Sequence, residues 1–240
     1  MLTVKYVILA LVTSLLVGYF IGAFNLSYIL SRLKGFDIRK YGSGNAGASN
    51  VIIIFGKKAG AIVAIIDIMK ACLAVIIART LFENAVVGNL NWAGLVAGAA
   101  TIIGHIAPFY MKFKGGKGLA SLGGTILATD YRLFVVLLLI AIVIAVVTDY
   151  ICFVPLTMVV AFPLVISIAN HTWIPMAIFL VPIIWVWYRH MENLRRIKLG
   201  KELRFHFLWN RSSESERFGI EDDMEKVLEY ELDESRIINK

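Results

Sequence analysis

The sequence predicts an all-α, polytopic membrane protein with about seven transmembrane helices, and three observations lead to this class. Of its 240 residues 59% are hydrophobic, and the mean hydropathy of +0.76 is far above that of ordinary soluble domains. Several apolar runs approach or exceed the roughly 20 residues that a helix needs to cross a bilayer. Polar loops rich in glycine and basic residues separate these runs, and the strand alternation of outer-membrane barrels is absent.

Seven apolar segments are expected to form the helices. The first is interpreted as a transmembrane helix rather than a signal peptide, because further spans follow it. The fourth would be only about 18 Å long as a helix, so we expect a broken helix or a short helix buried by its neighbours. In chain order the segments are 6–30, 59–82, 92–111, 118–129, 132–150, 152–170 and 173–189.

The charges are distributed unevenly along the chain. Residues 1–212 contain 20 Lys and Arg and 7 Asp and Glu, a net charge of +13, whereas residues 213–240 contain 4 and 10, a net charge of −6. We therefore expect a membrane domain over residues 1–211 and an acidic tail over 212–240, with at most one amphipathic helix at about 221–232. The tail is expected either to dock on the basic face or to remain a solvated arm.

The loops predict the orientation in the membrane. Seven spans place sixteen of the 20 basic residues of the first 212 on one side, which the positive-inside rule makes cytoplasmic. We therefore expect a multi-pass protein of the plasma or inner membrane, with the amino terminus outside and the carboxyl terminus cytoplasmic. If segment 118–129 did not cross, the charges would be divided between the two sides, which argues against that arrangement.

A polar loop at residues 39–50 is the first candidate site. Its glycines allow backbone N–H groups to turn toward a ligand, its Ser and Asn side chains add neutral hydrogen-bonding groups, and its arginine suits a phosphate or carboxylate. It imitates a dinucleotide-binding fingerprint, but no strand precedes it, so an anion site at the membrane surface is favoured. The candidate residues are Arg39, Gly42, Ser43, Gly44, Asn45, Gly47 and Asn50.

A second glycine-rich turn, Gly115-Gly116-Lys117-Gly118, resembles part of a P-loop. Met111 and Gly118 stand where a Walker motif needs glycine and a hydroxyl residue, which argues against nucleotide triphosphate binding. Free amides and one lysine can still hold a phosphate. The alternative, a basic turn at the membrane interface, is equally compatible with the spacing.

Ionisable residues also occur within the apolar runs. Asp67 and Lys70 are spaced i, i+3 in the second segment, and His105 is near the end of the third. Such groups are costly in a membrane and indicate either function or a structural ion pair. No metal site is expected, because no second His or Cys lies at metal-ligand spacing from His105.

His190, Asn193 and Arg196 follow the last segment at i, i+3 and i+6, so that a helix would present them on roughly one face. Together they suit a phosphate and an adjacent hydroxyl. The alternative is a basic juxtamembrane helix on anionic lipid. The two cysteines, Cys72 and Cys152, lie in apolar runs and are expected to be buried free thiols.

These pieces occur in the order found in a known family. Over roughly residues 15–205 the chain resembles the bacterial acyl-phosphate-dependent glycerol-3-phosphate acyltransferases, which are integral inner-membrane enzymes with seven helices. Several motifs in one order are far more specific than one alone. The segments that carry the resemblance are Gly22–Tyr28, Phe36–Arg39, Gly42–Val51, Gly56–Lys58, Asp67–Lys70, Gly104–His105, Pro108–Phe109, Lys112–Ala120 and His190–Gly200.

The resemblance implies transfer of a fatty acyl group from an acyl phosphate to the 1-hydroxyl of glycerol 3-phosphate, giving lysophosphatidic acid and phosphate. It implies no acyl-CoA, cofactor, metal or nucleic acid, and leaves the oligomeric state open. It assigns the donor phosphate to Arg39, Ser43, Asn45 and the turn of Gly115, Gly116, Lys117 and Gly118, with Gly42, Gly44, Gly47 and Asn50 in the same loop site. It assigns glycerol 3-phosphate to His190, Asn193 and Arg196.

The chain departs from the family pattern at several positions. Ala23 and Asn25 replace a serine and a proline, and Ile53 replaces an arginine. Asp149 and Cys152 replace an arginine and a serine. These departures motivate a rival hypothesis, a non-catalytic lipid-binding or regulatory paralogue. A weaker rival is a transporter, suggested by Asp67, Lys70 and the short segment 118–129, although the two halves of the chain show no convincing repeat.

Overall fold

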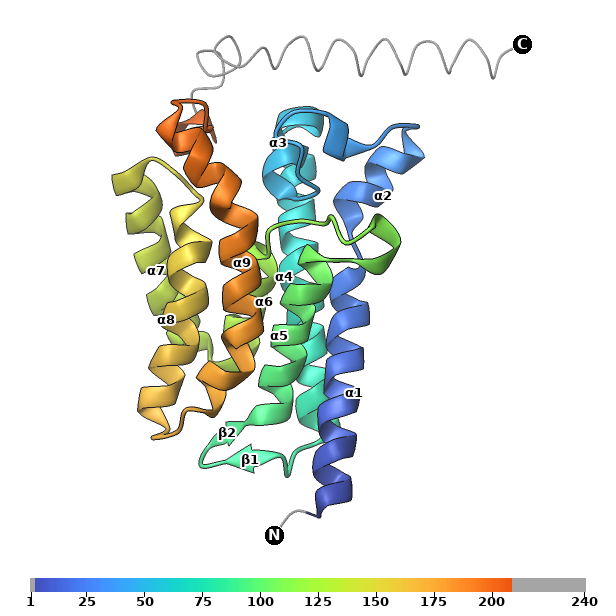
Figure 1. Cartoon of the computed structure of the whole chain (residues 1–240), viewed down its shortest axis with the longest axis vertical. Coiled ribbons are helices and arrows are strands. Elements are labelled where there is room, and N and C mark those ends of the chain that lie inside the picture. Colours follow the sequence, from blue (N-terminus) through green and yellow to red (C-terminus); the bar gives the residue numbers. More distant parts are fainter. Residues whose placement is uncertain (1–2, 209–240) are drawn as a thin grey trace, which may run out of the picture.

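The computed structural model describes residues 3–208, which form a bundle of helices with a short hairpin at one end (Figure 1). The acidic tail and its expected helix lie outside the described residues. The helices are α1 (Val4–Ala23), α2 (Leu26–Leu33), α3 (Ala48–Phe55), α4 (Lys57–Leu81), α5 (Trp92–Ile106), α6 (Leu119–Thr129), α7 (Tyr131–Thr148), α8 (Phe153–Ala169) and α9 (Ile174–Lys198). The remaining elements are strands β1 (Val86–Val87) and β2 (Leu90–Asn91) and the 3-10 helices η1 (Ile38–Lys40), η2 (Phe109–Met111) and η3 (Phe205–Leu208).

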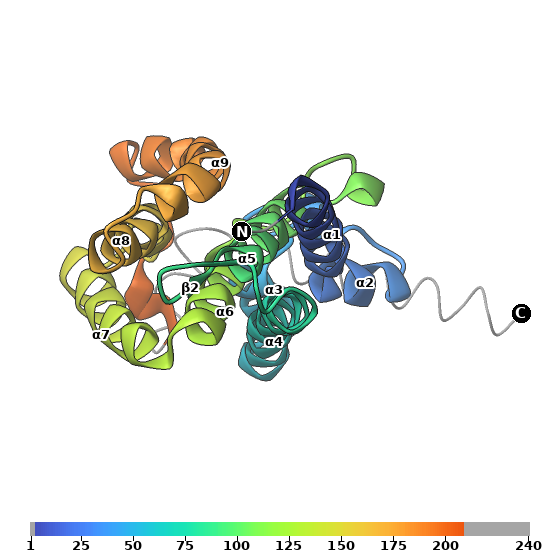
Figure 2. The same cartoon turned by 90° about the horizontal axis from the view of Figure 1, so that it is seen from below.

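Within residues 3–208, five helical stretches are long and apolar enough to cross a membrane, and α6 and α8 are shorter apolar helices. The chain is therefore an all-α, multi-pass membrane protein, as predicted. The long elements alternate in direction through the bundle (Figure 1). Seen from the hairpin end, α6 lies between the α4–α5 pair and the α7–α8 pair (Figure 2). The expectation that seven segments each cross the membrane remains a prediction.

Small residues allow α1 to pack closely against α5. Ala10, Ser14, Gly18 and Gly22 recur every four residues and are buried. A Cβ atom at Gly18 would collide with the carbonyl oxygen of Ala97, so the two backbones can approach only because glycine is present. Packing of this kind replaces the hydrophobic effect as the force that holds helices together within a bilayer.

The first predicted helix, 6–30, is wrong as a continuous element because the chain breaks between α1 and α2. Asn25 causes the break by capping α2, since its Oδ1 accepts a hydrogen bond from the Tyr28 N–H at 2.8 Å. Its Nδ2 donates to the carbonyl of Ala46 at 3.0 Å. Asn25, one of the departures from the family pattern, therefore joins this break to the loop at 39–50.

Of the two forms expected for segment 118–129, helix α6 adopts the second, a short helix packed among its neighbours. At 11 residues it spans about 16 Å, roughly half a bilayer core. A Cβ atom at Gly124 would collide with the carbonyl oxygen of Ile68 in α4, which places the two helices in backbone contact. The guanidinium of Arg79 donates to the Ala128 carbonyl near the end of α6 at 2.7 Å. Because α6 spans only about half of the bilayer core, the loop before it must reach into the bundle.

The last span continues further than predicted. Segment 173–189 was expected to end before the basic residues, but α9 runs unbroken from Ile174 to Lys198. No glycine or further proline occurs until Gly200, so nothing interrupts the helix after Pro182. His190, Asn193 and Arg196 consequently lie on a rigid element.

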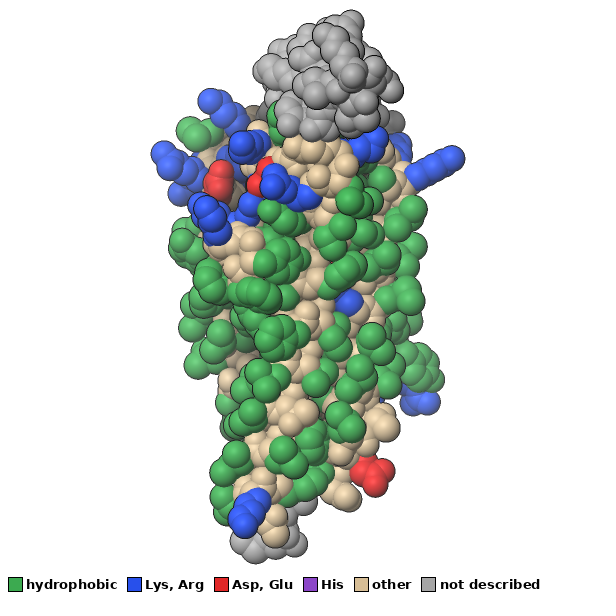
Figure 3. Space-filling model, turned by 90° about the vertical axis from the view of Figure 1, so that its right-hand side faces the viewer, with side chains coloured by type: hydrophobic (Ala, Val, Ile, Leu, Met, Phe, Trp, Pro, Cys, Tyr) green, Lys and Arg blue, Asp and Glu red, His purple; other side chains and the backbone are tan. Residues whose placement is uncertain are grey.

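The outer surface divides into an apolar flank and a basic end. Hydrophobic side chains cover the flank, and most Lys and Arg side chains gather beside the loops at the end opposite the hairpin (Figure 3). Helix α7 has few buried residues and exposes Leu139, Val143 and Val147. An apolar flank of this kind is suited to contact with lipid.

Candidate active site

Asn50 organises the loop at 39–50 from within. Its Nδ2 donates to the carbonyls of Ile38 at 3.0 Å and Tyr41 at 3.1 Å, and its Oδ1 accepts from the Ser43 N–H at 2.8 Å. Gly42 adopts φ +57°, and a Cβ atom there would collide with the Asn50 amide. The buried Asn50 side chain thus holds Ser43 and Asn45 at the cavity described below.

Arg39 joins this loop to the loop before α6. Its Nε and Nη2 donate to Asp37 at 2.9 and 2.7 Å, and its Nη1 donates to the carbonyls of Met111 at 2.7 Å and Lys114 at 3.2 Å. Its guanidinium stacks on Tyr28 at 4.9 Å. The hydrogen bond from Arg39 lowers the pKa of Asp37 below its usual value. The geometry favours a positioning role for Arg39, and its assignment to substrate stays a prediction.

The glycine turn differs in detail from what the sequence suggested. The N–H groups of Gly115 and Gly116 donate to the carbonyls of Ile106 and His105, at 2.9 and 3.1 Å, so they are not free for a phosphate. The same bonds close the end of α5 and aim Lys117 into the bundle. Gly118 caps α6 at φ +91° with no side chain, which leaves the amino-terminal end of α6 beside Lys117. A helix amino terminus favours anions.

Lys117 begins a chain of polar contacts to α9. Its Nζ donates to Asn193 Oδ1 at 2.6 Å, and Asn193 Nδ2 donates to Glu202. Glu202 also accepts from Arg196 Nε at 2.7 Å. Burial, reinforced by the nearby charge of Arg196, lowers the pKa of Lys117 to about 8. The structure thus brings Lys117 into contact with Asn193 and, through Glu202, close to Arg196, two of the three residues predicted to share a face of α9.

His190 lies one turn before Asn193 and is almost fully buried, with 2% of its surface exposed. Its Nδ1 is 2.7 Å from the carbonyl of Val186. Because a carbonyl only accepts, Nδ1 carries a hydrogen, and Nε2 of the neutral ring is left as an acceptor. His190 lines the same cavity as Lys117 and Asn193.

The intramembrane charges form one buried cluster. Lys70 Nζ is 2.6 Å from Asp67 and 3.0 Å from His105 Nδ1, and it donates to the carbonyl of Phe24 at 2.7 Å. A Cβ atom at Gly116 would collide with the His105 ring, so the cluster lies directly beneath the glycine turn. These contacts favour the structural interpretation of the pair, with His105 as an added member.

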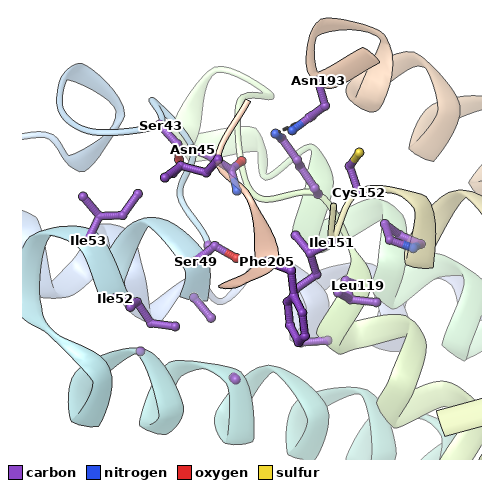
Figure 4. Close-up of a pocket in the computed structure, with 18 of the residues that line it drawn as sticks. Ser43, Asn45, Ser49, Ile52, Ile53, Leu119, Ile151, Cys152, Asn193 and Phe205 are labelled. Atoms are coloured by element: carbon purple, nitrogen blue, oxygen red, sulfur yellow. Dashed lines mark hydrogen bonds between the residues drawn. The ribbon is translucent and has the colours of Figure 1, made fainter. Parts of the chain in front are cut away.

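Two cavities meet at these residues. A largely apolar one of about 360 Å³ extends from the polar loops toward α4, α6 and α8. Figure 4 shows Ile52, Leu119 and Phe205 on its walls, with Ser43, Asn45 and Asn193 at its polar end. A second cavity of about 870 Å³ opens among basic side chains, including Lys112, Lys114, Arg189 and Arg195. The residues shared by both cavities are Ser43, Asn45, Lys117 and Arg196.

Sequence reasoning placed most of these side chains but missed others. It did not identify Glu202 as the partner of Asn193 and Arg196, because Glu202 lies beyond the end of α9 and returns to the helix only in the folded chain. It also missed the pairing of Asp149 with His206, whose atoms Oδ2 and Nδ1 lie 2.7 Å apart. Gly44 lines the basic cavity and Gly47 the apolar one, whereas Gly42 supports Asn50. No group of His, Cys, Asp or Glu within residues 3–208 is arranged to hold a metal ion.

The fold and the cavities define an integral membrane protein in which an apolar pocket meets a basic, phosphate-suited one. The model of the family described as "Glycerol-3-phosphate acyltransferase" matches residues 12–200, and the chain belongs to this family. A glycerol-3-phosphate acyltransferase of Thermoanaerobacter pseudethanolicus is 34% identical over 195 residues, covering 80% of this chain and 93% of that protein. Glycerol-3-phosphate acyltransferase 1 of Deinococcus radiodurans is 36% identical over 192 residues, with the same coverage.

Solved structures agree with this assignment. A crystal structure of PlsY (YgiH), described as an integral membrane glycerol 3-phosphate acyltransferase in its glycerol 3-phosphate form, superimposes with a TM-score of 0.73. It is 29% identical in sequence, and the match covers 82% of this chain and 96% of that one. The form of that protein described as containing lysophosphatidic acid gives a TM-score of 0.69 at 28% identity. The predicted family and enzyme class, an acyltransferase of phospholipid synthesis, are confirmed.

Proposed function

We propose that this chain transfers a fatty acyl group from an acyl phosphate to the 1-hydroxyl of glycerol 3-phosphate, releasing lysophosphatidic acid and inorganic phosphate. The observation that carries the proposal is the junction of the apolar and basic cavities at Ser43, Asn45, Lys117 and Arg196. A donor with an apolar chain and a phosphate head fits an apolar pocket that ends in cationic groups. A small anionic acceptor such as glycerol 3-phosphate suits the basic cavity, whose opening is called the basic mouth below.

The acyl phosphate would lie with its chain in the apolar cavity and its phosphate at the junction. Lys117, the Ser43 hydroxyl and the amino-terminal end of α6 all face that point. The leaving group gains negative charge as its bond to the carbonyl carbon breaks, and a lysine with a helix terminus stabilises this charge. Arg39 and Asn50 serve in this mechanism by holding the two loops in place.

Glycerol 3-phosphate would enter through the basic mouth, where Arg189 and Arg195 raise the local concentration of anions. Asn45 Oδ1 is buried without a hydrogen-bond partner in residues 3–208 and can accept from an acceptor hydroxyl. A bond then forms between the glycerol oxygen and the carbonyl carbon as the bond to the donor phosphate breaks. The hydroxyl proton passes to His190 Nε2 or to a phosphate oxygen, and holding the two substrates together supplies much of the rate.

The charge distribution supports the proposed orientation. The basic end that holds both polar loops would face the cytoplasm, where glycerol 3-phosphate is available, with the amino terminus outside and the carboxyl terminus inside. The acidic tail would then be cytoplasmic. Cysteine reactivity toward a membrane-impermeant maleimide, at single cysteines placed in the β1–β2 hairpin or after α9, tests this orientation.

The decisive experiment is acyl transfer by the protein reconstituted in lipid vesicles. Palmitoyl phosphate and radiolabelled glycerol 3-phosphate should give labelled lysophosphatidic acid, and palmitoyl-CoA should give none. Product from palmitoyl-CoA alone would overturn the donor assignment. Lys40→Ala is a matched control, because Lys40 is exposed and lines neither cavity.

One observation favours a non-catalytic lipid-binding or regulatory protein as the second candidate. Ile53 and Cys152 line the apolar cavity at positions where the family pattern has an arginine and a serine. If folded protein binds glycerol 3-phosphate by calorimetry but transfers no acyl group from either donor, this candidate replaces the enzyme. Such a result would also direct the search to other anionic acceptors.

A further inference from the structure

The segment after α9 turns back across the apolar cavity. Leu203 packs against the hydrophobic cluster formed by α3, α4 and the loop before α3, which includes Val51, Ile54 and Val63. Phe205, two residues later, packs against the separate cluster of α5–α9. Residues 203–205 therefore contact both hydrophobic clusters, and the side chains of Leu203 and Phe205 line the cavity.

Asp149 fixes the far end of this bridge. Its carbonyl accepts from the Phe205 N–H at 2.7 Å, and its Oδ1 accepts from the His206 N–H at 3.0 Å. Its Oδ2 is 2.7 Å from His206 Nδ1. Asp149 itself caps α7 at φ +59°, a left-handed conformation that Asp and Asn tolerate better than most residues. Three oxygen atoms of Asp149 thus hold the backbone at Phe205 and the side chain of His206 in place.

The Phe205 ring points into the apolar part of the cavity. Figure 4 shows it beside Ile151 and Leu119, away from the polar end marked by Ser43 and Asn193. On α4, the part of the cavity wall between Lys57 and Asp67 consists of the small residues Gly60, Ala61 and Ala64. The ring is therefore the largest side chain in the apolar half of the lining, and it limits the space left for a ligand.

We propose that Phe205, held by the Asp149 contacts, determines which acyl chains the cavity accepts. The inference rests on the proposed function, because the acyl group of the donor is taken to occupy this cavity. Asp149 acts as a positioning residue, since it lies outside the cavity lining and acts through the backbone of residues 205–206. Chains that extend past Ile151 would meet the ring, and shorter chains would not.

The test compares acyl phosphates of 10 to 18 carbons with wild-type protein, Phe205→Ala and Phe205→Trp. Burying one more methylene is worth about fourfold in affinity, the equivalent of ~0.8 kcal/mol. We expect Phe205→Ala to shift kcat/KM toward longer chains by about fourfold for each added methylene, and Phe205→Trp to shift it toward shorter ones. The KM for glycerol 3-phosphate should not change. Phe20→Ala, on the exposed face of α1, is the matched control and should leave the chain-length profile unchanged.

A second pair of variants tests the positioning role. Asp149→Ala should broaden the chain-length profile, whereas Asp149→Asn keeps an oxygen acceptor and the left-handed cap and should restore most of the selectivity. Binding of non-hydrolysable acyl phosphonates, measured by calorimetry, reports the same preference without turnover. An unchanged profile in folded, active Phe205→Ala protein would refute the inference while leaving the acyltransferase proposal intact. A wild-type protein that neither transfers nor binds acyl phosphate would refute the proposed function, and this inference with it.

Discussion

Replacing Lys117 by alanine tests the site most directly. Lys117 Nζ lies at the junction of the two cavities and contacts Asn193 at 2.6 Å. A preorganised donor to a charge that develops in the transition state is worth about 2.7–4 kcal/mol. We therefore expect kcat/KM to fall by about 10²–10³ in Lys117→Ala. Some of the loss will reflect Asn193, whose Oδ1 loses its partner while its Nδ2 stays bound to Glu202.

The pH dependence separates charge from packing at this position. Burial lowers the pKa of Lys117 to about 8, so its protonated fraction falls as the pH rises through that value. An anionic substrate favours the protonated form, and its affinity should therefore drop by up to tenfold per pH unit above about 8. Lys117→Arg keeps its charge throughout this range, so this variant should lose the alkaline decline even if its activity is reduced.

The assay is acyl transfer in vesicles from pH 6 to 9.5, with kcat and KM resolved for both substrates. Lys40→Ala provides the matched control for loss of a surface charge. If Lys117→Ala retains activity within threefold of wild type, Lys117 does not contact the reacting phosphate. If Lys117→Arg shows the same alkaline decline as wild type, the titrating group is another residue.

Three further predictions concern the buried groups. His190→Gln should lower kcat by about 10²–10⁴ if Nε2 takes the hydroxyl proton, and by much less if a phosphate oxygen does, as single-turnover measurements will show. Lys70→Met should destabilise the protein by about 3–5 kcal/mol, because it leaves the Asp67 carboxylate buried without the ammonium group of Lys70. Thermal unfolding in detergent measures this loss, and a melting temperature equal to that of wild type would contradict it. Cys152 is buried, with 2% of its surface exposed, so its thiol should resist maleimide at pH 7.5. Cys152→Ser should preserve or raise transfer by supplying a hydroxyl to the cavity, and rapid labelling or lost transfer would contradict these expectations.

Predictions from the sequence succeeded where local pattern is sufficient. The long apolar runs determine α4 and α7 within two residues at each end, because no other structure satisfies the backbone in lipid. The segment predicted at 92–111 was too long, since α5 ends at Ile106, shortly before Pro108. The spacing of His190, Asn193 and Arg196 placed them on one side of α9, and all three line the apolar cavity. A predicted helix boundary was wrong where a side chain caps a new helix. The side chain of Asn25 accepts a hydrogen bond from the Tyr28 N–H and so divides the predicted helix 6–30 into α1 and α2.

The roles of individual polar residues were less accessible. Arg39 and Asn50 are residue types that often bind ligands, yet most of their side-chain hydrogen bonds go to neighbouring loop atoms, although Arg39 also lines the basic cavity. Free amides were expected at Gly115 and Gly116, but the carbonyls that end α5 take both N–H groups. A polar group satisfies its hydrogen bonds with whatever lies nearest in space, and the sequence does not list those neighbours.

The sequence by itself determined the membrane class, the basic face, the order of the motifs and hence the family, because these depend on composition and on spacing within single helices. Only the tertiary structure decided that Lys117 meets Asn193 across 76 residues, and that Asp149 meets His206 across 57. It also decided that an apolar and a basic cavity share one junction. Contacts between distant segments arise from how helices pack, and packing depends on small residues such as Gly18 and Gly124 whose partners lie elsewhere in the chain.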